Sequence, residues 1–404
     1  MNIPAEQSKF LLAASRRQHV AMRPVPAAAP RLLFDNSLSI LNRTGAYHIA
    51  KDLCSEFVPQ HAGVRYWRLG SVAPEGIARK IIARLMMLEI NWLKDSATFL
   101  IRDGATDESF IRVFLDPLYV LRSALAQTDV VLCHDVGPLT HRPLYDPRTT
   151  ESYRRAYEKI RRAKPGLVFV SDWSKSNFVS LYGSDFRFLR TIPLYVRTEL
   201  FDGLQEALPA VDGPFFLTVG AFEARKNQIT ALKAYRDGGF HEQGVKFVLC
   251  GPRGNGHEHI VEFAKSVPGV VLPGYVSDSQ LRWLYGNAEA FILPSLLEGF
   301  GMPALEAAYM GLLPIVSKDS ALVEAVRGVC DEVPPDDANA IGQAMRRVLS
   351  RRPEEKAEVG RLLQNVAARA TKARFLKRWH DLLLSPTQPS APVARPVTAA
   401  LPQG

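Results

Sequence analysis

The segment Phe291–Gly311 reads FILPSLLEGFGMPALEAAYMG and decides the fold class. A short apolar run, typical of a buried strand, ends at Pro294. A loop with two glycines then leads to Pro303, which fits the first turn of a helix because the amide that proline lacks is unpaired there anyway. Gly311 stands where a glycine commonly ends a helix. Strand, loop and helix in this order predict one unit of a parallel α/β sheet.

The loop in this segment is a candidate anion site. The amides of residues 299–303 precede the positive end of the predicted helix, and the glycines let a ligand approach the backbone closely. These features suit a diphosphate. The predicted ligand-binding residues of the loop are Ser295, Gly299, Phe300, Gly301 and Met302.

Two carboxylates flank the candidate anion site, with seven residues between Glu298 and Glu306. A carboxylate does not bind a phosphate directly, since like charges repel, so we expect each to accept hydrogen bonds from hydroxyl groups or to orient a cation. A nucleotide sugar offers hydroxyls on both sides of its diphosphate. The alternative is structural: Glu306 favours the helix N-terminus and Glu298 caps the loop.

The rest of the chain alternates short β-branched runs with amphipathic helical windows, which is typical of parallel sheets covered on both faces. The predicted strands are 31–35, 64–69, 129–134, 167–171, 214–220, 245–251, 270–274, 289–294 and 313–317. The predicted helices of the first half are 44–57, 116–126, 152–164 and 173–182. The predicted division is a disordered leader (1–30), two Rossmann-like domains (31–205 and 206–368), a final helical segment (369–384) and a disordered tail (385–404).

A second polar segment, TVGAFEARKNQ, follows the strand predicted at 214–220. Arg225 and Lys226 in this segment are fixed cations of the kind needed to stabilise a departing diphosphate without a metal ion. Gly220 and Gly251 follow neighbouring predicted strands at the sheet edge where ligands bind. The alternative is a basic turn that precedes a helix beginning at Asn227.

The composition limits the classes of protein. The chain has 404 residues, 47% of them apolar, and a net charge of +9. No apolar run approaches the roughly 18 residues that cross a bilayer. The first 200 residues carry 28 Lys and Arg against 19 Asp and Glu, most densely in the predicted helix Glu151–Lys164. That helix is a solvated face or is attracted to anionic lipid or a phosphate-bearing acceptor; no nucleic-acid-binding module is apparent.

The string around GFGMPAL, with Glu298 and Glu306 at its ends and PIVS after it, resembles the signature of retaining glycosyltransferase family 4. Within that family the chain is similar to the mannosyltransferase-like group of bacterial surface-polysaccharide synthesis, over residues 31–384. The resemblance implies the GT-B fold: two Rossmann-like α/β domains face each other across a deep cleft, and a C-terminal helix crosses back to the first domain. It implies that Glu298 contacts the donor sugar and that Glu306 holds the ribose.

Other segments extend the resemblance. VVLCHDV places His134 where the family has an active-site histidine that faces the donor sugar, and NRTGAY resembles the loop that closes over the diphosphate, with Arg43 and Gly45 as donor-binding residues. GPRGNGHEH, which begins at Gly251, is expected to shape the base pocket. In the diphosphate loop many family members have an arginine where this chain has Ala221, so Arg225 and Lys226 carry more of that role.

The resemblance implies a retaining, metal-independent glycosyltransferase with no cofactor, and the chain has no Asp-x-Asp pair. The expected donor is GDP-mannose or another GDP-, UDP- or dTDP-sugar. The expected acceptor is a saccharide or lipid-linked saccharide, in the cytoplasm or at the inner face of the cell membrane. Two alternatives stay open: an epimerase or phosphorylase of the same fold, and a non-catalytic binding protein.

Overall fold

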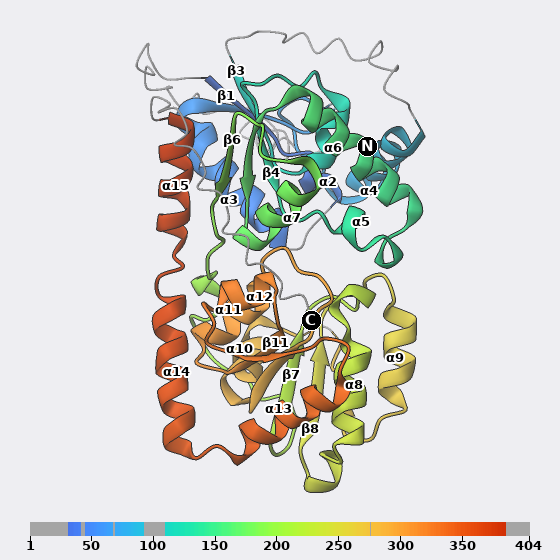
Figure 1. Ribbon diagram of the computed structural model, residues 1–404, viewed down its shortest axis with the longest axis vertical. Coiled ribbons are helices and arrows are strands. Elements are labelled where there is room, and N and C mark those ends of the chain that lie inside the picture. Colours follow the sequence, from blue (N-terminus) through green and yellow to red (C-terminus); the bar gives the residue numbers. More distant parts are fainter. Residues whose placement is uncertain (1–30, 42–44, 68, 93–109, 275, 385–404) are drawn as a thin grey trace, which may run out of the picture.

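The computed structural model describes residues 31–41, 45–67, 69–92, 110–274 and 276–384, which form two α/β domains stacked along the long axis (Figure 1). The predicted leader, the predicted tail and Arg43 lie outside the described residues. None of the helices in these ranges is long and apolar enough to cross a bilayer.

The N-terminal domain is built on a parallel sheet of six strands in the order β2-β1-β3-β4-β5-β6. Its central strands are buried along their whole length, because helices cover both faces of the sheet. The strands are β1 (Arg31–Asp35), β2 (Ala62–Arg65), β3 (Phe110–Phe114), β4 (Val130–Cys133), β5 (Gly166–Phe169) and β6 (Phe188–Thr191).

The sequence prediction missed helix α4 (Gly76–Trp92) and strands β3 and β6 of this domain, and it was wrong at one further place. The helix predicted at 116–126 is instead a short 3-10 helix, because Asp116 caps it by accepting from the Leu118 amide and Ser123 is already extended. The helical elements are α2 (Leu38–Leu41), α3 (Gly45–His61), α4 (Gly76–Trp92), η2 (Pro117–Arg122), α5 (Gly137–Thr140), η3 (Arg142–Leu144), α6 (Pro147–Ala163), α7 (Asp172–Tyr182) and η4 (Thr198–Leu200).

The C-terminal domain has a second parallel sheet of six strands, in the order β12-β11-β10-β7-β8-β9. This is the Rossmann order, in which the chain reverses direction across the sheet between β7 and β10, and such a switch point is where doubly wound sheets bind ligands. The strands are β7 (Phe215–Val219), β8 (Lys246–Cys250), β9 (Val270–Val271), β10 (Ala290–Leu293), β11 (Pro314–Ser317) and β12 (Asp331–Val333).

Helices cover both faces of this sheet as well, and all five strands predicted in the second half are present (Figure 1). The helical elements are η5 (Ala224–Lys226), α8 (Gln228–Asp237), η6 (His241–Gln243), α9 (His257–Lys265), α10 (Asp278–Asn287), α11 (Met302–Tyr309), α12 (Ala321–Ala325), α13 (Ala338–Ser350), α14 (Pro353–Ala367) and α15 (Lys372–Leu384).

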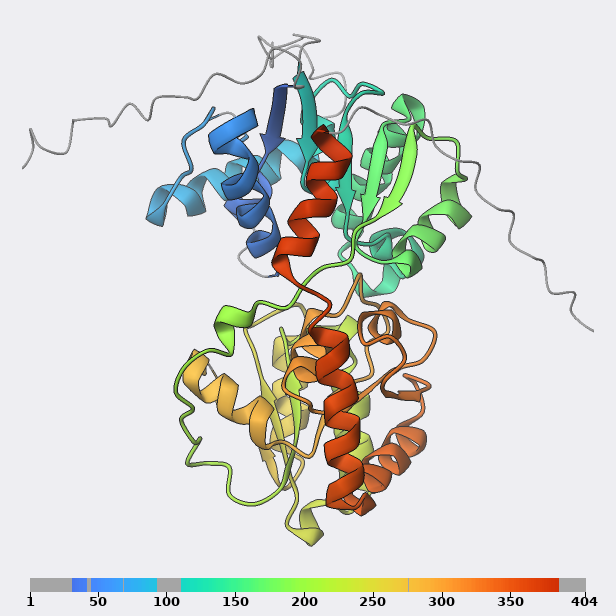
Figure 2. The same cartoon turned by 90° about the vertical axis from the view of Figure 1, so that its left-hand side faces the viewer.

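The last two helices run along one side of the molecule, α14 on the C-terminal domain and α15 on the N-terminal domain (Figure 2). The ring of Phe375 in α15 lies 4.9 Å from that of Tyr195, and His380 Nε2 lies 2.8 Å from Glu56 Oε1 in α3. The chain therefore crosses between the domains twice, once after β6 and once before α15.

Candidate functional site

The loops after β7 and β10 meet at the switch point of the C-terminal sheet. The Leu296 amide donates to the Arg225 carbonyl at 2.8 Å, and Asn227 Nδ2 donates to the Pro294 carbonyl at 3.1 Å. Two segments about 70 residues apart in sequence are thus joined by one backbone and one side-chain hydrogen bond. This brings the basic turn and the loop that precedes α11 to the same edge of the sheet.

A carboxylate and two cations form the centre of this region, with Glu298 between Lys226 and Arg225. Lys226 Nζ lies 2.8 Å from Glu298 Oε1, and Arg225 Nη1 lies 3.1 Å from Glu298 Oε2. Ser295 Oγ also donates to Oε1, at 3.2 Å. Burial alone would raise the pKa of Glu298, but the two cations outweigh it and lower that pKa to about 2. Glu298 is therefore a carboxylate throughout the physiological range.

The two cations differ in their exposure. Lys226 is buried at 6% exposed and lies beneath Gly220, whereas the Arg225 side chain keeps 26% of its surface in solvent. Arg225 Nε also pairs with Glu223 Oε2 at 2.6 Å. An ammonium has three N–H donors and a guanidinium has five, so both cations can bind an anion while they keep their contacts to Glu298.

The backbone before α11 supplies further donors. Gly301 is the N-cap residue, with a φ of 100° that a side chain would strain. The amides of Phe300, Gly301 and Met302 donate no hydrogen bond to any described residue. Unpaired amides at a helix N-terminus form a binding site for an anion. These three amides are therefore candidate donors to an anion, and their binding role stays a prediction.

Glu306 lies in α11 and is held in a different set of contacts from Glu298. Its Oε1 lies 3.0 Å from Arg197 Nη2, and its Oε2 accepts from the Tyr285 hydroxyl at 3.2 Å. Burial raises the pKa of Glu306, and Arg197 offsets only part of that effect. Arg197 belongs to the connection between the two domains, so Glu306 is a structural contact of that connection in addition to its predicted role toward ribose.

The N-terminal domain meets the site at Gly299. A Cβ on Gly299 would lie 2.4 Å from the carbonyl oxygen of His134, so only glycine allows this approach. Ser171 and Ser174 donate to the Gly299 carbonyl at 2.6 and 3.1 Å. His134 Nε2 lies 3.2 Å from the Leu115 carbonyl oxygen, which can only accept, so this ring nitrogen is the donor of the pair.

Three more predicted glycines lie at close approaches between segments. Gly45 begins α3, and the space beside it is filled by the sulfur of Met302, 3.1 Å from where a Cβ would be. Gly251 packs on Gly220: a Cβ on Gly251 would lie 2.0 Å from the Gly220 carbonyl oxygen. The structure therefore gives Gly251 a packing role between the loops after β7 and β8.

Sequence reasoning missed two residues at the site. Tyr145, in the loop before α6, is mostly buried near Asp135, Arg225 and Glu298, and burial raises the pKa of its hydroxyl. Arg197 follows β6 and reaches Glu306. Neither belongs to a periodic or glycine-rich pattern, so the sequence carries no local signal for them.

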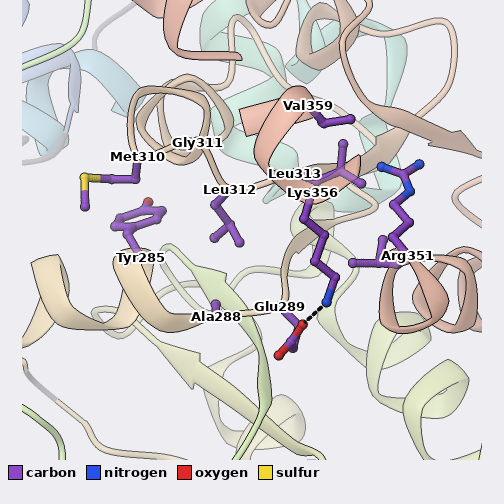
Figure 3. Close-up of a pocket in the computed structure, with 12 residues that line it drawn as sticks. Tyr285, Ala288, Glu289, Met310, Gly311, Leu312, Leu313, Arg351, Lys356 and Val359 are labelled. Carbon is purple, nitrogen blue, oxygen red and sulfur yellow. Dashed lines mark hydrogen bonds and ion pairs between the residues drawn. The ribbon is translucent and has the colours of Figure 1, made fainter. Parts of the chain in front are cut away.

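A cavity of about 130 Å³ lies elsewhere in the C-terminal domain (Figure 3). Its lining includes Glu289 and Lys356, which form an ion pair at 2.6 Å, and Leu313. Glu289 and Leu313 directly precede β10 and β11, so the cavity lies at the opposite ends of the strands from the Glu298 cluster. It is therefore separate from the candidate active site.

Comparison with known proteins places the C-terminal domain beside a family of glycosyl transferases. Residues 204–361 match the family model described as "Glycosyl transferases group 1". The O-antigen chain mannosyltransferase B of Escherichia coli is 29% identical over 52% of this chain and 58% of its own length. The MMP alpha-(1->4)-mannosyltransferase of Mycolicibacterium hassiacum is 28% identical over 53% of this chain and 52% of its own length. The chain thus spans little more than half the length of these curated relatives.

Two solved structures share the whole architecture. Sucrose-phosphate synthase from Thermosynechococcus elongatus superposes with a TM-score of 0.65 over 87% of this chain and 98% of that chain, at 17% identity. The Anabaena protein HepE in complex with UDP and glucose gives 0.63 over 88% and 99%, at 15% identity. These similarities confirm the GT-B fold, and the family match supports the predicted class of glycosyltransferase.

Proposed function

We propose that this protein is a glycosyltransferase that moves a sugar from a nucleotide diphosphate donor to a saccharide acceptor between its two domains. The observation that carries the proposal is the cluster of Glu298, Lys226 and Arg225 at the switch point between β7 and β10. The amides of Phe300, Gly301 and Met302, which donate to no described residue, follow Glu298 closely in the chain. A diphosphate is the ligand that matches two fixed cations and a helix N-terminus together.

In the proposed reaction the acceptor hydroxyl forms a bond to the anomeric carbon while the bond to the diphosphate breaks. The proton of the hydroxyl passes to the departing phosphate oxygen, on the same face of the sugar, so the anomeric configuration is retained. Lys226 and Arg225 stabilise the charge that develops on the leaving group. Glu298 orients both cations and accepts hydroxyl hydrogen bonds from the donor sugar, and His134 faces that sugar from the N-terminal domain.

Mannose from GDP-mannose is the proposed donor. The support is the similarity to two proteins named as mannosyltransferases, one of them an O-antigen enzyme. On this basis the acceptor is a growing surface polysaccharide or its lipid-linked precursor, at the cytoplasmic face of the membrane. A UDP-sugar is the second candidate, because the HepE structure of the same fold holds UDP and glucose.

A panel of GDP-mannose, UDP-glucose and dTDP-rhamnose tests the donor. A ligand that binds only the native state stabilises it by about 2.7 kcal/mol at one hundred times its Kd, so the true donor raises the melting temperature most. Transfer to a mannose-terminated oligosaccharide is then followed by mass spectrometry, and the anomeric configuration of the product by NMR. No shift with any nucleotide would refute the proposal.

The proposal gives no role to a metal ion. We expect the transfer rate to be the same after dialysis against EDTA as before it, because the fixed cations meet the charge of the leaving diphosphate. A rate that falls with EDTA and returns with Mg²⁺ or Mn²⁺ would show that an ion shares this role.

A further inference from the structure

Helix α4 presents an apolar face to solvent. Ile77, Ile81, Leu85 and Leu88 are 78%, 56%, 52% and 54% exposed. Their spacing of four, four and three residues places all four on one side of a helix. Four large aliphatic side chains in one stripe differ from the scattered apolar residues that any surface carries, and such a stripe marks a docking site.

The opposite side of α4 is fixed to the domain, so the exposed face is not a consequence of a loosely packed helix. Met86 and Ile90 are fully buried, and Glu89 accepts from the Trp67 indole at 2.6 Å. Arg155 of α6 donates to the Ile90 carbonyl at 2.7 Å. The helix is therefore anchored on one side and exposes the apolar stripe on the other.

Two cations border the stripe. Lys80 and Arg84 are exposed, and at 100° per residue they lie along one edge of the apolar sector, while no acidic residue lies within it. No ion pair among the described residues involves either side chain. An aliphatic stripe with unpaired cations along its edge matches the boundary between the headgroups and the acyl chains of an anionic bilayer.

The basic helix α6, which the sequence suggested for this purpose, is less suited to it. Arg154 and Arg161 pair with glutamates of the same helix at 2.6 and 3.0 Å. Arg155 and Lys159 donate to backbone carbonyls of the domain. Most of its cations are therefore already engaged within the protein, and α6 has no exposed apolar stripe.

We infer that α4 docks the protein on an anionic lipid surface. Ile77, Ile81, Leu85 and Leu88 enter the acyl boundary, and Lys80 and Arg84 contact the phosphates of the headgroups. The inference rests on the proposed function for one point only, that the acceptor is carried by a lipid.

The position of α4 connects this surface to the active site. Helix α4 lies beside α2, and Arg79 of α4 donates to the Ile40 carbonyl in α2 (Figure 1). The next helix, α3, begins at Gly45, which packs against the sulfur of Met302 in the candidate site. Docking through α4 thus brings the part of the N-terminal domain that contacts the candidate site close to the membrane, where a lipid-linked acceptor is presented.

The test is flotation of the full chain with vesicles of phosphatidylcholine alone or with about 30% phosphatidylglycerol. We expect binding to the anionic vesicles. Replacement of Ile77, Ile81, Leu85 and Leu88 by Ser should weaken it by about tenfold or more, since each aliphatic side chain contributes. The Lys80→Gln/Arg84→Gln variant should lose about tenfold on anionic vesicles only.

Matched controls exchange residues of the same kind elsewhere. The variant Leu181→Ser/Leu204→Ser/Leu362→Ser removes three exposed leucines outside α4, and Arg154→Gln/Arg161→Gln removes two exposed cations of α6. Both should bind as the wild type does. Equal loss in these controls, or no binding by the wild type, would overturn the inference.

Sedimentation without lipid decides between a membrane and a second copy of the chain. A wild-type dimer that becomes a monomer in the α4 serine variant, together with no vesicle binding, would show that another protomer covers the stripe and would overturn the inference. Donor binding is measured in parallel by thermal shift. A wild type that binds the donor but no vesicles refutes the docking alone, and one that binds vesicles but no donor refutes the proposed function alone.

Discussion

Lys226 Nζ and Glu298 Oε1 lie 2.8 Å apart, although 72 positions separate the two residues in sequence. Both side chains are buried, so neither charge is stable there without the other. Arg225 adds a second, more exposed cation to the same carboxylate. Glu298 therefore holds two cations in place before a donor arrives. Such preorganised charge is the condition for effective stabilisation of a leaving group.

Replacement of Lys226 by Met should lower kcat by about a hundredfold to a thousandfold, as does the loss of one group that stabilises developing charge in other enzymes. The change is read from initial rates of transfer at saturating donor. Lys233→Met serves as the control, because this lysine is exposed on α8, and its rate should equal that of the wild type. A Lys226→Met enzyme with the wild-type kcat would remove the electrostatic basis of the proposed function.

Replacement of Glu298 by Gln should destabilise the protein in a pH-dependent way. The pKa of Glu298 is about 2 in the folded protein and 4.5 as its ordinary value. This depressed pKa contributes stability that is fully present above pH 4.5 and is lost as the pH falls toward 2. The shift corresponds to about 3 kcal/mol.

The measurement is urea unfolding of the wild type and Glu298→Gln between pH 3 and pH 8. The difference in unfolding free energy should be constant from about pH 5 upward and should shrink steadily below pH 4.5. A difference independent of pH over this range would mean that the carboxylate charge does not hold the two cations.

The extent to which the sequence predicted this fold follows from the pattern of each strand. Strands β7, β8, β10 and β11 are apolar runs bounded by Gly or Pro, and all were predicted. Strands β3 (FIRVF), β6 (FLRT) and β12 (DEV) were missed, because each has a charged residue inside a short run, and β6 and β12 also lie at sheet edges. The helix predicted at 116–126 was wrong because the cap at Asp116 starts a shorter 3-10 turn.

The sequence also predicted only part of the candidate site. The motif predicted the loop before α11 and the basic turn as one anion site, and the structure brings them together at Glu298. It did not predict that Glu306 is already paired with Arg197, because Arg197 lies in a connection without periodic pattern. Contacts of that kind depend on how two domains pack, which local sequence does not encode.

Replacement of Gly299 by Ala should impede the approach of the two domains. The new Cβ would lie 2.4 Å from the carbonyl oxygen of His134, a backbone atom that cannot turn away. We expect the transfer rate to fall about tenfold to a hundredfold and the radius of gyration from X-ray scattering to increase.

Gly63→Ala is the matched control for this change. Its nearest neighbour would be Leu33 Cδ1 at 3.3 Å, the end of a side chain that can move, so rate and radius should stay as in the wild type. A Gly299→Ala protein with an unchanged radius and unchanged rate would show that the contact between Gly299 and His134 is not required for transfer.

Arg197 and Glu306 should behave as a coupled pair in a double-mutant cycle. Arg197→Met leaves a buried carboxylate without its cation and should cost about 3 kcal/mol at neutral pH, and Glu306→Gln a similar amount, with a coupling energy of about 1–3 kcal/mol between them. Burial raises the pKa of Glu306, so the folded protein takes up a proton at this carboxyl at a higher pH than the unfolded chain does. The cost of Arg197→Met should therefore shrink at acidic pH, where Glu306 is protonated and no longer needs its cation. Urea unfolding of the four proteins at pH 7.5 and pH 4.5 measures both effects. Donor titration distinguishes a role of Glu306 in donor binding from its structural role. If Glu306 binds the donor, Glu306→Gln should weaken donor binding even in the Arg197→Met background. Additive costs that do not depend on pH would mean that the pair seen at 3.0 Å does not hold the domain connection to α11.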